Sequence, residues 1–159
     1  MPHDDELAAL GATPIVLRSL LAEGRESRPA GDEDWTAKEV VAHLRDCEEF
    51  RLLRCRRMRD EDEPYLAAFD QEALARERDY ASCDLDQALD SFAQLRGQVL
   101  ALLAALDDAG WQRVGLHEED GRITIESHIR HAISHDLVHL RQIAESLRPL
   151  TREERRSTR

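Results

Sequence analysis

Four of the seven histidines lie between residues 124 and 143, at spacings that suit metal binding. They are His128, His131, His135 and His139, and on a helix they fall within an arc of roughly 80°. Apolar residues occupy the same side of this helix and charged residues the opposite side, so the imidazole rings are expected to point inward. Because His135 and His139 are one turn apart, both can reach a single metal ion.

A third ligand can come from His43, which lies on the apolar side of another predicted helix. Two ligands from one helix and one from a second are a common way to hold a metal between packed helices. Three neutral imidazoles would leave a coordination position open, where water could ionise near neutral pH or a thiol could bind as thiolate. The alternative is that these histidines are structural and hydrogen-bonded in the core.

Other polar residues near this face have possible supporting roles. His131 is expected beside the ligands, although it could bind the metal in place of His139, and His128 is expected at the mouth of the cavity. Gln142 could orient a ligand or a bound water, and Asp136 could accept a hydrogen bond from a ligand's second ring nitrogen.

Arg54 shares the face of His43 and could meet an anionic substrate group, although a solvated or ion-paired arginine is the commoner case. His117 is expected to be a solvated loop residue, and His3 to be disordered.

Four amphipathic helices are predicted, and together they indicate an all-α four-helix bundle. The second starts at a capping box formed by Thr36 and Glu39, whereas Gly11 and Pro14 could kink or delay the first. Residues 61–83 should form a long crossover with one short helix, and residues 111–122 a surface loop or small hairpin. No strand-rich region is predicted. The helices are expected at about residues 4–23, 36–60, 84–108 and 124–148.

The length and composition fit a single domain, residues 1–148, followed by a polar tail at 149–159. The net charge of −11, from 33 acidic and 22 basic residues, disfavours binding to nucleic-acid phosphates. The one basic cluster is followed at once by acidic residues 60–63. It comprises Arg51, Arg54, Arg56, Arg57 and Arg59.

The cellular setting is expected to be the cytoplasm. Cys47, Cys55 and Cys83 are odd in number and lack metal-site spacing, which is typical of reduced core cysteines. The first residues do not resemble a signal peptide, and the longest uncharged run is too short to cross a membrane. Homodimerisation through helix faces is a further possibility.

Four segments of the sequence match a known family pattern. They are WTAKEVVAHLRD at 35–46, RCRRM at 54–58, PYLAAFD at 64–70 and HDLVHLRQI at 135–143. Through them, nearly the whole chain, from the first helix to about residue 147, resembles the DinB/YfiT-like superfamily. The resemblance implies an up-down-down-up four-helix bundle with a divalent metal held by three histidines, which correspond to His43, His135 and His139.

The resemblance also implies an activity. Members include S-transferases that use a low-molecular-weight thiol such as bacillithiol or mycothiol, so thiol transfer to an electrophilic small molecule is the expected reaction. A metal-dependent hydrolase of esters or amides is one alternative, and a non-catalytic metal-binding stress or interaction protein is another. Zinc or nickel is the expected metal, although three imidazoles also suit iron and copper.

Overall fold

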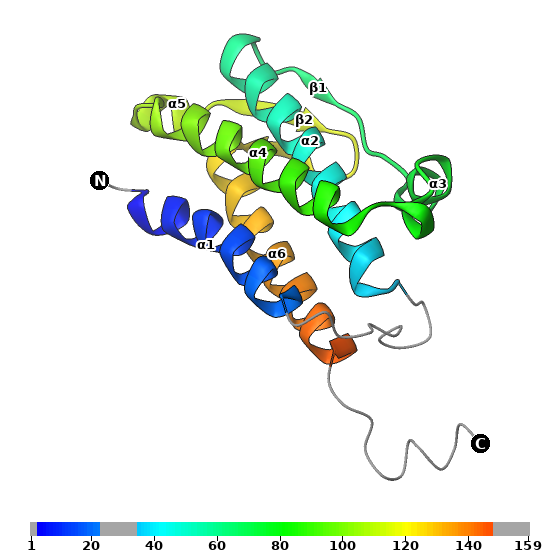
Figure 1. Cartoon of the computed structure of the whole chain (residues 1–159). Helices are drawn as coiled ribbons and strands as arrows, with labels where there is room; N and C mark the ends of the chain where they lie inside the picture. The colour runs from blue at the N-terminus through cyan, green and yellow to red at the C-terminus, as the bar shows by residue number, and fades with distance from the viewer. Residues whose placement is uncertain (1–2, 23–34, 148–159) are drawn as a thin grey trace, which may run out of the picture.

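The computed structural model of the chain describes residues 3–22 and 35–147, in which four long helices form a bundle (Figure 1). The expected tail at 149–159 and the linker at 24–34 lie outside these residues. Helices α1 and α2 each pack against both α4 and α6. The predicted four-helix architecture is confirmed. The bounds are Asp4–Leu21 for α1, Ala37–Asp60 for α2, Leu85–Ala104 for α4 and Ile125–Leu147 for α6.

The crossover between α2 and α4 returns the chain to the end of the bundle at which α2 begins. It contains strand β1 (Tyr65–Leu66), helix α3 (Gln71–Glu77) and a 3₁₀ turn, η1 (Tyr80–Ser82). At its end, Lys38 Nζ donates to the Ala81 carbonyl, and the Cys83 thiol lies 3.8 Å from the Lys38 carbonyl oxygen. Helix α4 therefore runs parallel to α2, as the predicted long crossover requires.

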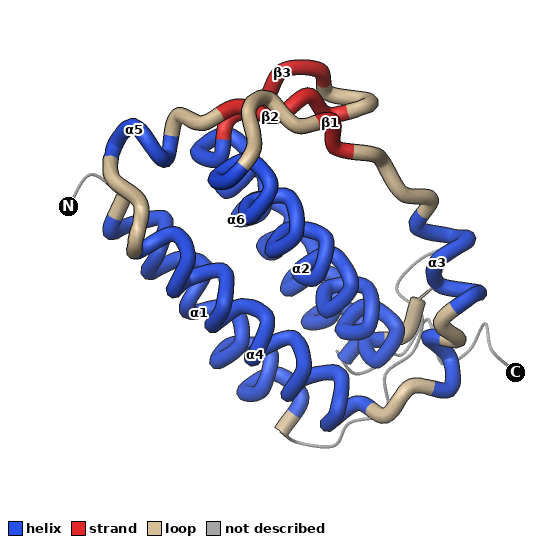
Figure 2. Tube along the Cα trace, turned by 90° about the horizontal axis from the view of Figure 1, so that it is seen from above, coloured by secondary structure: helices blue, strands red, loops and turns tan. Residues whose placement is uncertain are grey.

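A small sheet covers one end of the bundle, which the sequence did not predict (Figure 2). β1 pairs in parallel with β2 (Val114–His117), which forms an antiparallel hairpin with β3 (Gly121–Thr124). Gly115 permits this packing, because a Cβ atom there would lie 2.6 Å from Leu66 Cδ1. The small hairpin is present, which was one of the two forms expected for residues 111–122, and the two-residue strand β1 of the crossover adds to its edge.

The helix ends follow local capping chemistry. The predicted capping box is present, with the Thr36 backbone N–H donating to Glu39 Oε2 at 2.8 Å. The third long helix ends at Ala104 rather than near Asp108, because Asp107 caps a separate short helix, α5 (Asp108–Trp111). His3 is ordered, contrary to expectation, and stacks on Trp111 with ring centroids 3.9 Å apart.

Two apolar clusters fill the bundle, and a buried polar layer separates them. Each long helix contributes one residue to this layer: Thr13 from α1, Glu48 from α2, Arg96 from α4 and Asp136 from α6. One cluster is centred on Leu10, Leu52, Met58, Val99, Leu103 and Ile129, and the other on Leu17, Val40, Leu44, Phe92 and Ile143.

The polar layer is held by Arg96, whose guanidinium donates to two carboxylates and one backbone carbonyl. It makes a paired contact with Glu48 at 2.7 and 3.0 Å and bonds Asp136 Oδ2 at 2.8 Å. Its Nη1 also donates to the Leu10 carbonyl at 2.8 Å. That carbonyl lacks its usual helical partner because Pro14, four residues on, has no N–H. The proline therefore lies within α1 without ending it.

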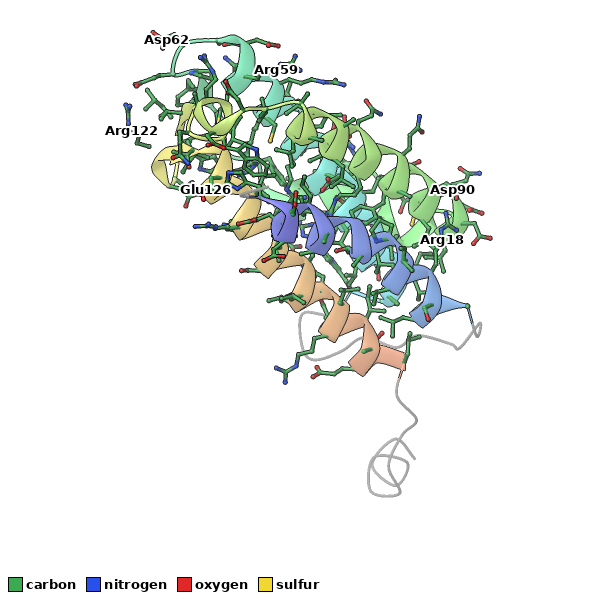
Figure 3. All side chains as sticks on the ribbon, turned by 90° about the vertical axis from the view of Figure 1, so that its left-hand side faces the viewer. Arg18, Arg59, Asp62, Asp90, Arg122 and Glu126 are labelled. Carbon is green, nitrogen blue, oxygen red and sulfur yellow. The ribbon has the colours of Figure 1, made fainter. Side chains whose placement is uncertain are left out.

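The surface ion pairs differ from this layer in exposure. Arg18 of α1 and Asp90 of α4 form a largely exposed pair, and the two lie side by side in Figure 3.

In the part of the chain that the structure describes, no helix is both long and apolar enough to cross a membrane.

Candidate metal centre

Helices α2 and α6 bring three histidines together, although they are far apart in the chain. His135 Nε2 lies 3.2 Å from His43 Nε2 and 3.2 Å from His139 Nε2. Ring nitrogens of all three residues lie within 4.8 Å of one another. The antiparallel packing of α2 on α6 thus assembles a cluster that neither helix could form alone.

The donor set fits a divalent cation. Four ligands placed tetrahedrally at 2.0–2.1 Å from zinc are separated by about 3.3 Å, close to the two measured Nε2 separations. Without a cation, an N–H would have to point from one Nε2 to the next at each short contact, because two facing lone pairs repel. A cluster of neutral imidazoles whose lone pairs converge is the arrangement that a metal stabilises.

Neighbouring side chains fix the rings of two of the three histidines. Gln142 Oε1 accepts a hydrogen bond from His139 Nδ1 at 2.8 Å, which leaves the Nε2 lone pair directed at the cluster. The His43 ring packs against Trp35 with centroids 4.9 Å apart. His135 Nδ1 is buried and has no hydrogen-bond partner among the residues that the structure describes.

Burial favours the neutral form of these rings. It lowers the pKa of His43 to about 3, with the nearby His139, His135 and Arg51 acting in the same direction. Burial, with the nearby His139 and Arg51 as smaller causes, also lowers the pKa of His135 to about 4, and burial lowers that of His139. The three nitrogens therefore keep their lone pairs available into the acid range.

These shifts predict that the metal-free protein loses stability as the pH falls below about 6.5. An unfolded histidine takes up a proton near pH 6.5, whereas folded His43 and His135 do so only near pH 3 and 4. In that window the unfolded state binds more protons, and each such histidine costs up to about 1.4 kcal/mol per pH unit. Urea titrations of chelator-treated protein at pH 7.5 and pH 5.0 measure the effect.

His43→Asn is the matched comparison for this pH dependence, because it removes one titrating ring from the same cluster. We expect a smaller difference in unfolding free energy between the two pH values for this variant. Equal stability of the wild type at pH 7.5 and 5.0 would contradict the neutral cluster.

A cavity of about 210 Å³ opens beside the cluster, and His135 belongs to both. Its walls come from α2, α6, the β2–β3 turn and the segment between β1 and α3. The lining includes Cys47, Arg51, Arg54, Phe69, His117, Glu119, Asp120, His128, His131 and His135. A small molecule in this cavity would contact His135, the residue of the cluster that lines it.

Three polar residues beside the histidine cluster have different roles. Gln142 orients a predicted ligand, as anticipated, whereas the role expected for Asp136 was wrong: its Oδ2 accepts from Thr13 and Arg96 in the polar layer. His131 is exposed and its ring lies 6.4 Å from that of His135, at the cavity wall.

Two residues near the site were missed or misjudged. His117 is 9% exposed and lines the cavity, rather than being a solvated loop residue. Cys47 lies one turn after His43, and its Sγ is 3.4 Å from His43 Nε2. Burial raises the pKa of the Cys47 thiol to about 12. The four-residue spacing of His43 and Cys47 equals that of His135 and His139. This spacing was the signal in the sequence that could have placed Cys47 beside the cluster.

The fold and the cluster define a class: helical-bundle proteins with three convergent histidines beside a small cavity. Comparison with family models assigns the chain more closely, because the model of the DinB superfamily matches residues 8–143. The chain belongs to the DinB superfamily.

A similar protein is YfiT of Bacillus subtilis (strain 168), which is 27% identical over 147 residues, covering 89% of this chain and 82% of YfiT. Its solved structure is described as a probable metal-dependent hydrolase with an unusual four-helix bundle topology. That structure matches with a TM-score of 0.83 at 25% identity and covers 89% of this chain and 83% of YfiT.

Proposed function

We propose that this chain is a metal-dependent enzyme of small molecules, in which His43, His135 and His139 hold one divalent cation. The observation that carries the proposal is the approach of the three imidazoles at the wall of a cavity. A cation bound there would act as a Lewis acid and lower the pKa of water or of a thiol at its open position. Zinc and nickel remain the metals we expect.

The surrounding side chains supply orientation and shape. Gln142 holds the His139 ring through Nδ1, and Trp35 packs on the His43 ring. Phe69, which lines the cavity, stacks on Phe50 with centroids 4.2 Å apart and gives the cavity an apolar surface. These contacts would hold a substrate close to the cluster while leaving one side of it accessible.

For the reaction, hydrolysis of a small ester or amide is supported by the description of YfiT as a probable metal-dependent hydrolase. Thiol transfer to an electrophile such as an epoxide, alkyl halide or activated alkene is the second candidate. This candidate follows from the family resemblance of the sequence. The cavity beside the cluster could admit a thiol as well as water. Bacillithiol and mycothiol are the candidate thiols.

The two reactions are distinguished by dependence on thiol. Metal-loaded protein is incubated with a panel of 4-nitrophenyl esters, and separately with a generic electrophile and cysteine as the thiol. Ester turnover without thiol supports hydrolysis, whereas electrophile consumption that requires thiol supports transfer. Both rates should fall to background in His139→Ala protein. A metal-loaded wild type that is no faster than this variant in either assay would favour the non-catalytic alternative.

A further inference from the structure

Arg54 is a positioned guanidinium on the wall of the cavity. Its Nη2 donates to the Ala67 carbonyl at 2.6 Å, and its Cζ lies 5.7 Å from the centre of the Phe69 ring. Phe69 in turn stacks on Phe50. These contacts hold the guanidinium in place without neutralising its charge.

Three other arginines of the cluster around Arg54 each pair with a carboxylate, whereas Arg56 is exposed and contacts Gln98. Arg51 pairs with Glu48, Arg57 with Glu61, and Arg59 with Asp60. Among the residues that the structure describes, no carboxylate lies within ion-pairing distance of Arg54. Burial lowers its pKa, so the charged form is partly desolvated at that position.

The floor of the cavity has further unused hydrogen-bonding groups. Arg51 is 6% exposed, and its Nε has no hydrogen-bond partner within residues 3–22 and 35–147. His128 Nε2 is also buried without a partner in these ranges. Unpaired buried polar atoms are costly, and both belong to residues that line the same cavity as Arg54.

The acidic residues of the cavity lie on the β2–β3 turn. Asp120 is engaged by His117, with Nδ1 and Oδ2 3.2 Å apart, and its side chain is 60% exposed. Glu119 is also exposed. These two carboxylates moderate the potential near Arg54, but they lie in solvent and neither pairs with it.

We propose that the cavity binds a small molecule bearing a carboxylate, with Arg54 as its ion-pair partner and Arg51 Nε and His128 as further hydrogen-bonding groups. A planar carboxylate matches the guanidinium fork, and charge-assisted pairs of this kind are strong when partly buried. The inference rests on the proposed function in one respect: the carboxylate would hold the substrate's reacting group against the histidine cluster. The substrate class is therefore a carboxylate-bearing ester, amide or electrophile.

The test compares benzoate with benzamide, which share a shape and differ in charge. Each is titrated into the full-length, isotope-labelled protein, with metal and after chelator treatment, and binding is followed by two-dimensional NMR. We expect benzoate to bind about tenfold or more tightly than benzamide in both forms, because the Arg54 pair does not depend on the metal. Arg54→Gln should remove this preference.

The matched control is Arg56→Gln, two residues along the same helix, since Arg56 is exposed and contacts Gln98 rather than the cavity. It should keep the preference for benzoate. Arg54→Lys retains the charge but not the fork, and should weaken benzoate binding severalfold even if Arg54→Gln fails to fold. An unchanged benzoate affinity in Arg54→Lys and Arg54→Gln would overturn the proposal.

Inorganic phosphate, titrated in parallel, tests the choice of anion. Tighter binding of phosphate than of benzoate would overturn the carboxylate assignment. Because these measurements need no turnover, they separate the two proposals. Arg54-dependent benzoate binding in a protein without activity would refute only the proposed function, and activity without Arg54-dependent binding would refute only the carboxylate site.

Discussion

Replacing His135 with alanine is expected to lower the affinity for a divalent metal by at least about 100-fold. His135 Nε2 is the nitrogen that lies 3.2 Å from both other ring nitrogens, so its loss would leave two of the three proposed ligands. Loss of a residue that merely orients a ligand costs 10–100-fold, and loss of a ligand should cost more. Metal content by elemental analysis and affinity by chelator competition measure the effect.

Two variants calibrate this result. His131→Ala removes an exposed histidine one turn earlier on α6, outside the cluster, and should bind metal as the wild type does. Gln142→Leu removes the hydrogen bond to His139 Nδ1 and should weaken binding by roughly 10–100-fold. If His135→Ala binds metal as tightly as His131→Ala, the proposed ligand set is wrong.

The second large effect is expected from Arg96→Met, which should lower the free energy of unfolding by about 3–5 kcal/mol. The change leaves Glu48 and Asp136 buried with fewer partners and leaves the Leu10 carbonyl with none. Breaking a buried ion pair from one side is strongly destabilising because the remaining charge stays desolvated. Against a total of about 5–15 kcal/mol for a typical protein, this is a large fraction, and urea titration measures it.

Arg18→Ala provides the matched control, because Arg18 also links two helices of the bundle through a carboxylate. Its pair with Asp90 is largely exposed, and such pairs contribute about 1 kcal/mol or less. Arg96→Lys keeps a charge and loses the paired geometry, so its stability should lie between wild type and Arg96→Met. A cost for Arg96→Met no greater than that for Arg18→Ala would show that the polar layer contributes little.

The four long helices could be predicted because their signals are local. The capping box of Thr36 and Glu39 and the apolar periodicity of α4 act within a few residues. The sheet could not be predicted in the same way. β1 has only two residues, and its partner β2 lies about fifty positions later, so no alternating pattern marks the pairing.

For the candidate site, the three clustered histidines could be predicted from the sequence, but the contacts of Asp136 could not. The spacing of His135 and His139 indicated one half of the cluster. The apolar side of the second predicted helix offered His43 as a third ligand, and the family resemblance implied the same set of three. The position of Asp136 was mistaken because α6 packs against both α1 and α2 and so has two inward sides. Periodicity assigns a residue to the inward half of a helix but does not tell which neighbour it meets, so Asp136 faces Arg96 while His135 faces His43.

The hydrogen bond from Arg96 to the Leu10 carbonyl has a consequence for the alignment of the helices along the bundle. A proline within a helix leaves one backbone carbonyl, four residues earlier, without its intrahelical hydrogen bond. In α1, Pro14 leaves the Leu10 carbonyl as this acceptor, and Arg96 donates to it. If α1 slid along α4 by one turn, about 5.4 Å, Arg96 would meet a carbonyl already bonded within the helix. The missing N–H of Pro14 thus helps to fix the axial position of α1 relative to α4.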